Sequence, residues 1–414
     1  MRRRERLLWT DKMVLGSALR GELTACHIRV DCFGRVDRAA LSRAARATSE
    51  SHLRLRSRIV AVPRLGPLET VYRFEEASPP DLAPIAAGEA ALAFVDRPFD
   101  VFKGPLWRIG LEAHDDGGSS VHVAWHHALG DGVAGFAILG ECLDRYRAAV
   151  GGPAAAPSAR TDGPPALRTR PRLGALLREV PSLFRAARTS SRARPIRTVH
   201  RFEKRVRVPA RASLSLHALA LAAAARPLAE RGIPSVAMPF NLRAALLRHR
   251  GIANVLYMVN TPVADLSRCH LGSERHRLAA SALRRLERLD MPAFRIASAF
   301  IAAAPRFALR WMAGKTHRGA RFLLSVLGAW PAKRLRDAAG GLTLGERARI
   351  VRVGGSVPLI AGIEHSLGVG VLGDEAVLTL TSDADAASAG ESVALLEAIA
   401  AELLDLSGES ARAP

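Results

Sequence analysis

The strongest constraint on the fold lies around residue 127, where an alternating apolar segment runs into two adjacent histidines and a tight turn. Residues 121–125 (VHVAW) alternate as a β-strand does. After Gly132, apolar side chains recur at the spacing of a helix. The connecting residues 126–132 read HHALGDG. The pattern predicts a strand that turns sharply into a helix, with Asp131 at the helix N-cap.

The second histidine of this turn has the chemistry of a general base. Alternation along the strand places Trp125 and His127 on one face and His126 on the other. An apolar environment disfavours the imidazolium ion, so we expect the His127 ring to be neutral near pH 7. Proton transfer by such a ring contributes about 10²–10⁴-fold to a rate. His127 is therefore the predicted catalytic residue, while His126, Asp131 and Gly132 are expected to support the turn.

The same residues are open to two other interpretations. His127 also fits a satisfied core histidine, and a His/Asp cluster also fits a zinc site. The spacings HExxH and HxH are absent, however, and His126 and His127 point to opposite faces of the strand. We therefore expect no metal.

The pattern HHxxxDG in residues 126–132 resembles the signature of the CoA-dependent acyltransferase superfamily. This superfamily includes chloramphenicol acetyltransferase, nonribosomal peptide condensation domains, polyketide-associated acyltransferases and wax ester synthase/diacylglycerol acyltransferases. Sparser similarity to the superfamily extends along the chain, in residues 51–59 (SHLRLRSRI), 98–108, 237–243 (AMPFNLR), 251–256 and 324–328 (LSVLG). The nearest branches are the wax ester synthase/diacylglycerol acyltransferase-like and the polyketide-associated acyltransferases.

The resemblance implies an α/β (α+β) fold with two chloramphenicol-acetyltransferase-like lobes. Each lobe would hold a mixed β-sheet with flanking helices, and the active site would lie in a tunnel between the lobes. We expect residues 1–150 to form the N-terminal lobe with the HHxxxDG motif and residues 201–414 to form the C-terminal lobe. Residues 151–200 would be a basic Pro/Arg-rich linker with an amphipathic helix.

The resemblance also implies transfer of an acyl group from a thioester to an alcohol, giving a wax ester, an acylglycerol or a polyketide ester. The donor would be acyl-CoA or an acyl carrier protein, with no bound cofactor, and His127 would act directly without an acyl-enzyme. In the superfamily the motif aspartate pairs with an arginine, and the candidates here are Arg243 and then Arg56. The Gly132 amide and Ser325 are candidate oxyanion donors.

The net charge of +21 is concentrated in two segments. Residues 151–200 hold ten arginines against two acids, and residues 301–338 hold eight Lys/Arg against one acid. Such segments suit anionic lipid headgroups or a polyanionic donor such as coenzyme A. We expect peripheral contact with a membrane surface, the alternative being that both segments pack on the protein itself. No nucleic-acid-reading motif accompanies the charge, so we expect no nucleic-acid partner.

Other features predict a cytoplasmic protein, peripheral to the inner face of the membrane. No apolar stretch approaches the ~20 residues of a membrane span. The basic start lacks the apolar core of a secretory signal, and the four cysteines show no CxxC spacing. Two other functions stay open: a non-catalytic condensation-like binding protein, and a basic membrane-surface or nucleic-acid-binding protein with structural histidines.

Overall fold

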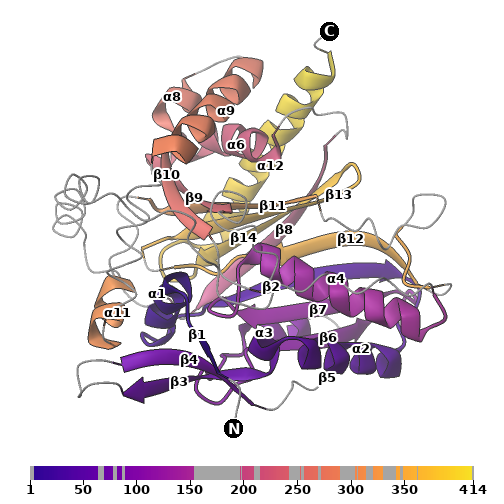
Figure 1. Cartoon of the computed structure of the whole chain (residues 1–414). Coiled ribbons are helices and arrows are strands. Elements are labelled where there is room, and N and C mark those ends of the chain that lie inside the picture. The colour runs from indigo at the N-terminus through magenta and orange to yellow at the C-terminus, as the bar shows by residue number, and fades with distance from the viewer. Residues whose placement is uncertain are drawn as a thin grey trace.

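The structure is a computed structural model that describes residues 4–63, 70–77, 82–85, 89–152, 196, 198–208, 215–241, 252, 256–268, 272–289, 304, 306–313, 320–329, 342–345, 348–360 and 362–412. These residues form three β-sheets with helices packed on them, arranged as two lobes (Figure 1). The α/β class expected from the sequence is confirmed.

The first lobe is built on a five-stranded sheet with the strand order β12-β2-β7-β6-β5. Its strands are β2 (Ala25–Phe33), β5 (Leu82–Ile85), β6 (Trp107–Ala113), β7 (Ser119–His126) and β12 (Arg349–Ser356). The helices α2 (Arg38–Ser51) and α4 (Gly132–Ala149) pack together on one side of this sheet, and α3 (Glu89–Asp96) lies near β2 and β5 (Figure 1). The sequence of residues 107–114 and 119–127 predicts a hairpin that carries the histidines, and the structure confirms it as β6 and β7. Asp37 is the N-cap of α2, because its side chain accepts a hydrogen bond from the Ala40 amide.

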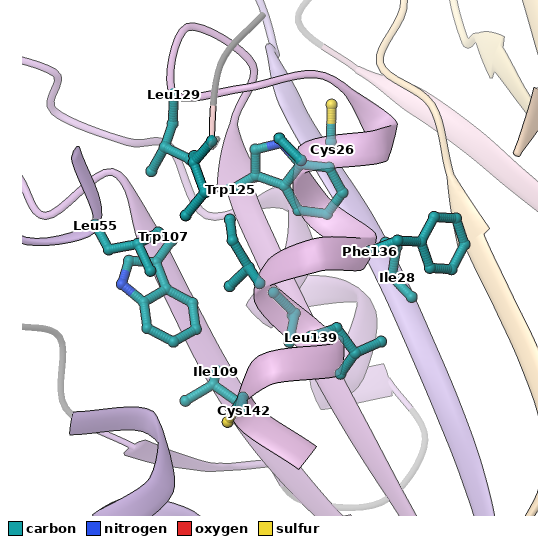
Figure 2. Close-up of a cluster of buried hydrophobic side chains, with 14 of the residues drawn as sticks. Cys26, Ile28, Leu55, Trp107, Ile109, Trp125, Leu129, Phe136, Leu139 and Cys142 are labelled. Carbon is teal, nitrogen blue, oxygen red and sulfur yellow. The ribbon is translucent and has the colours of Figure 1, made fainter. Parts of the chain in front are cut away.

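The core under α4 explains why this helix follows β7 so closely. Val121, Val123 and Trp125 on β7 are at most 1% exposed and belong to the cluster drawn in part in Figure 2. The Trp125 indole lies so close to Gly135 that a Cβ there would be 2.2 Å from the ring. A glycine at this position lets the helix approach the strand closely, which fixes the turn between them.

A small three-stranded sheet, β1 (Arg4–Arg6), β4 (Thr70–Glu76) and β3 (Ser57–Pro63), completes this lobe with the 3-10 helix η1 (Leu53–Arg56). Beside it, helix α1 (Trp9–Ala18) packs against α11 (Arg306–Ala313), as Figure 1 shows. A segment beyond residue 300 thus contributes to the lobe that the sequence assigned to residues 1–150.

The second lobe holds a six-stranded sheet in the order β10-β9-β11-β13-β14-β8. Its strands are β8 (Val199–Arg207), β9 (Ser235–Asn241), β10 (Leu256–Pro262), β11 (Phe322–Ala329), β13 (His365–Leu372) and β14 (Glu375–Asp383). The helices of this lobe are α6 (Leu216–Glu230), α8 (Ala264–Ser267), α9 (Gly272–Leu289) and α12 (Ala389–Arg412). The sequence of residues 363–381 predicts a hairpin and that of residues 387–404 a closing helix; the structure confirms both as β13, β14 and α12, which extends to Arg412.

Strand β12 links the two lobes. It follows the second lobe's β11 in sequence but pairs antiparallel with β2 in the first lobe, where Ser356 lies opposite His27. Its backbone also approaches β13: a Cβ added at Gly368 would be 3.1 Å from the Gly355 carbonyl oxygen. The C-terminal half of the chain therefore contributes one strand to the first lobe's sheet, which the sequence-based boundaries at residues 150 and 200 do not describe.

The amphipathic helix expected in residues 151–200 lies outside the described residues. Within the described part of the chain, no helix has both the length and the apolar character needed to cross a membrane.

Candidate active site

The turn after β7 is fixed by backbone hydrogen bonds on both sides of the two histidines. The His126 amide donates to the Leu106 carbonyl at 2.8 Å, and the His127 amide donates to the Thr24 carbonyl at 3.0 Å. The Leu129 amide then closes the turn by donating to the His126 carbonyl at 2.9 Å. The position of His127 is therefore set by the strands β2 and β6–β7.

Asp131 is the N-cap of α4, as the sequence predicts. Its backbone is extended, and its Oδ1 accepts a hydrogen bond from the Ala134 amide at 3.0 Å. Next to it, the Trp125 indole N–H donates to the Gly130 carbonyl at 2.8 Å. The aspartate and the tryptophan thus hold the start of the helix and the end of the strand in a single arrangement.

Arg54 supports the turn from the other side and was not predicted to do so. Its guanidinium is buried and donates to the Leu129 carbonyl at 3.3 Å. It also pairs with Asp11 at 3.2 Å and with Glu5 at 2.8 Å. The similarity of residues 51–59 to the superfamily is the signal that pointed to this segment, but it did not say which arginine reaches the turn.

The sequence proposed Arg243 and Arg56 as partners of Asp131. Arg56 donates to Glu76 on β4, which directs its guanidinium to the small sheet. Arg54, two residues earlier, is the arginine of this segment that contacts the histidine turn. Arg243 lies outside the described residues.

A cavity of about 300 Å³ lies between the two lobes at this turn. It brings together four predicted site residues, since His127, Asp131 and Gly132 line it from the turn and Ser325 lines it from β11. The rest of the lining is mainly apolar: Cys26, Ile28, Trp125, Val133, Pro239, Met258, Leu323, Val326, Val357, Pro358 and Ile360. His27, His217 and Ser356 are its remaining polar side chains. Because the candidate base His127 lines it, we call it the catalytic cavity.

His126 does not line the catalytic cavity. Its ring is 2% exposed, its Nδ1 accepts from the Ala128 amide at 3.1 Å, and it meets the Phe99 ring edge to face. Burial, together with the neighbouring His127, lowers the pKa of His126 to about 3. The ring is therefore a neutral structural element of the turn.

The environment of His127 favours the neutral form of its ring. Burial lowers the pKa of His127, and this effect outweighs the opposing ones of backbone hydrogen bonds at His127 and Gly130 and of the Asp131 charge. A hydrogen bond that raises a histidine pKa is one in which the ring donates. The backbone thus holds the ring in place while burial favours its neutral form.

Two further residues of the cavity carry polar groups. Ser325 on β11 is 8% exposed and lies opposite Gly368 of β13. His217, at the start of α6, also lines the cavity, and no motif in the sequence singled it out. Among the described residues no group of three or more His, Cys, Asp or Glu side chains is arranged to hold a metal ion.

Comparison with solved structures identifies the fold. The sequence matches no protein-family profile and no curated protein. The structure is similar to a mutant starter condensation domain of rhizomide synthetase RzmA in complex with C8-CoA and Leu-SNAC (TM-score 0.65, 14% identity, 98% of this chain and 94% of that one). It is also similar to polyketide synthase associated protein 5 from Mycobacterium tuberculosis (TM-score 0.61, 15% identity, 97% of each chain).

A third similar structure is TRI3 trichothecene 15-O-acetyltransferase from Fusarium sporotrichioides, with a TM-score of 0.70 and 11% identity over 97% of this chain and 95% of that one. The chain therefore has the two-lobed fold of condensation domains and related acyltransferases. The similarity extends over nearly the full length of each of these proteins, so the fold suspected from the HHxxxDG motif is confirmed.

Proposed function

We propose that the protein is an acyltransferase that moves an acyl group from an acyl thioester to a hydroxyl acceptor, with His127 as the general base. The observation that carries this proposal is the position of His127 on a cavity between two lobes, with a ring that burial keeps neutral. The apolar lining of the cavity suits an acyl chain. A condensation domain of the same fold was crystallised with an acyl-CoA, which supports acyl-CoA as the donor.

The reaction needs one proton carrier and one site for negative charge. His127 removes the hydroxyl proton while the acceptor oxygen attacks the thioester carbonyl carbon, which forms a C–O bond and an oxyanion. Donors aimed at that oxygen stabilise it, and Ser325 and the Gly132 amide are the candidates. Collapse of the intermediate breaks the C–S bond, and protonated His127 returns the proton to the thiolate. The products are an ester and a free thiol.

One similar structure supports the proposed acceptor class. One protein of this fold is named a 15-O-acetyltransferase, which supports a hydroxyl acceptor. Within that class, the apolar cavity favours wax ester, acylglycerol or polyketide ester formation. An acyl carrier protein is the other donor that we propose, since a condensation domain of a polyketide synthase has a similar fold.

Contact with a membrane surface is also part of the proposal. Phe307 and Trp311 lie one turn apart on α11 and are 70% and 54% exposed, while Leu309 between them is buried. Exposed aromatic side chains within a basic segment suit the headgroup region of an anionic membrane.

Product analysis of the purified protein tests the proposed reaction. The protein is mixed with an acyl-CoA series and with long-chain alcohols, diacylglycerol or polyketide-like diols, and esters are detected by mass spectrometry alongside free thiol. We expect ester and thiol in equal amounts, and we expect His127→Ala to abolish both while leaving the melting temperature unchanged. His200→Ala, a histidine on β8 outside the catalytic cavity, is the matched control.

The result can also favour a different function. Undiminished ester formation by His127→Ala would refute the assignment of the base. Binding of coenzyme A without any turnover by the wild-type protein would favour the non-catalytic binding protein.

A further inference from the structure

A second and larger cavity adjoins the catalytic cavity. Its volume is about 650 Å³, and it lies between the first lobe's sheet and strands β8 and β14 of the second lobe. We call it the polar chamber, because titratable and hydroxyl side chains of β2, β6, β7 and β14 line it. His27 and Ser356 line both the polar chamber and the catalytic cavity. These two residues face each other across the β2–β12 ladder, so they form the junction of the two cavities.

His27 is the end of a chain of three buried titratable side chains. Its Nε2 lies 3.1 Å from Nδ1 of His122 on β7, and the two rings are stacked with centroids 5.3 Å apart. Nε2 of His122 lies 3.0 Å from the carboxylate of Glu112 on β6. All three residues are at most 9% exposed. None of them belongs to the histidine turn.

This chain of hydrogen bonds holds the His27 ring in place. An ionised carboxylate only accepts hydrogen bonds, so His122 donates from Nε2 to Glu112. Nδ1 of His122 and Nε2 of His27 share the next hydrogen bond, which leaves Nδ1 of His27 outside the chain. Burial together with His122 holds the pKa of His27 well below its ordinary value, so its ring is neutral. The ring is thus fixed at the junction with one nitrogen available for a ligand.

Two hydroxyl groups near the junction have no hydrogen-bond partner within the described part of the chain. The side-chain oxygens of Ser356 and Thr379 are buried without such a partner, and both residues line the polar chamber. A buried hydroxyl without a partner costs about 1–3 kcal/mol, so such groups are expected where a ligand supplies the missing bond. Their presence beside His27 indicates a site for a ligand that both donates and accepts hydrogen bonds.

Three of the four arginines that line the polar chamber are already paired, which favours an uncharged ligand segment; the fourth, Arg205 on β8, is exposed. Arg29 and Arg352 both pair with Asp31, at 2.9 and 3.0 Å. Arg201 pairs with Asp96. Cations that already have carboxylate partners are poor ligands for a phosphate.

We propose that His27 and Ser356 form a recognition site for an uncharged, hydroxyl- or amide-bearing segment of a substrate, with Glu112 and His122 as positioning residues for His27. The assignment to a substrate rests on the proposed function. The segment comes either from an acceptor with a second hydroxyl group or from the pantetheine arm of the donor thioester. Both sources carry hydroxyl or amide groups that can form a hydrogen bond with Nδ1 of His27.

Calorimetric binding separates these two sources without depending on turnover. The probes are pantetheine, 1,2-hexanediol and, as a monohydroxyl reference, 1-hexanol, each titrated into the wild-type protein and His27→Leu. We expect His27→Leu to weaken either pantetheine or the diol about tenfold, the effect of one buried hydrogen bond, and to leave 1-hexanol unchanged. Ser356→Ala should weaken the same probe, and His200→Leu, outside both cavities, should weaken none.

The positioning role has a separate test. Glu112→Leu removes the acceptor that fixes the His122 tautomer and should weaken the same probe, whereas Glu112→Gln keeps a carbonyl acceptor and should restore much of the binding. With a turnover substrate, these variants should raise KM and leave kcat nearly unchanged.

Each outcome decides the proposal. If His27→Leu weakens only the binding of the diol, the site belongs to the acceptor. If it weakens only the binding of pantetheine, the site belongs to the donor. Equal binding of all probes by wild type and His27→Leu, or no binding of pantetheine or the diol by wild type, would overturn the proposal. His27-dependent binding without ester formation would support the site while the proposed function failed.

Discussion

Adding one methyl group at Gly135 tests whether the packing between α4 and β7 holds the histidine turn in place. The Cβ atom of Gly135→Ala would lie 2.2, 2.3 and 2.8 Å from three carbons of the Trp125 ring. The indole is 1% exposed and packed within the cluster of core side chains in Figure 2, so it cannot swing away into solvent. Because its N–H donates to the Gly130 carbonyl, a displaced ring disturbs the segment that follows His127.

Two opposing effects set the change in the free energy of unfolding. Overpacking a core lowers it by about 1–3 kcal/mol, and contacts this short on a rigid ring place Gly135→Ala at the upper end, about 3 kcal/mol. Replacing glycine by alanine inside a helix raises it by about 1 kcal/mol. We therefore expect Gly135→Ala to lower the free energy of unfolding by about 2 kcal/mol. A Cβ added at Gly140, further along α4, would meet no described atom within 4 Å, so Gly140→Ala should gain about 1 kcal/mol.

The measurement compares these two alanine variants of the same helix. Melting temperature should fall in the order Gly140→Ala, wild type, Gly135→Ala, and turnover should drop for Gly135→Ala alone. Hydrogen exchange of the first amides of α4 should be faster in Gly135→Ala, because the helix is destabilised first at its start, next to the turn. If both variants melted at the same temperature, the close approach of α4 to Trp125 would not be what fixes the turn.

Three other predictions concern the same turn. Asp131→Ala removes the N-cap of α4 and should cost about 0.5–2 kcal/mol together with turnover, whereas Asp131→Asn should keep most stability; unchanged melting of the alanine variant would argue against the cap. Arg54→Met leaves Asp11 buried without its cation and should lower stability by about 3–5 kcal/mol, as measured by melting temperature. Because burial lowers the pKa of His127 below its ordinary value of about 6.5, kcat/KM should fall in acidic buffer as the ring gains a proton, with a midpoint below pH 6.5; a midpoint above pH 6.5 would contradict the neutral base.

The features that the sequence predicts well are the local ones. The β6–β7 hairpin, the cap at Asp131 and the α4 helix depend on residues within about 40 positions of one another. The superfamily resemblance added Ser325, and the structure places it on the same cavity as His127 although nearly 200 residues separate the two. That juxtaposition was inferred from similarity, since no spacing or periodicity relates the two positions.

The features that could not be predicted from the sequence depend on how strands far apart in the chain pair with one another. Ser356 faces His27 only because β12 leaves its own lobe to pair with β2, and the alternation of either strand does not specify its partner. Arg54 and Arg56 are equally basic and two residues apart. Which of them reaches the turn depends on the acids that meet each one, Asp11 and Glu76, and these lie on other elements.

Strand β12 also determines whether the polypeptide can be cut into two parts that fold separately. Without residues 349–356, β2 would be an unpaired sheet edge in the first lobe, and an open edge of that kind invites aggregation. Neither half of the polypeptide, cut at the basic segment near residues 151–200, would then be a self-sufficient folding unit. The same strand also ties the two lobes together, because it pairs with β2 on one side and contacts β13 and β14 of the second lobe.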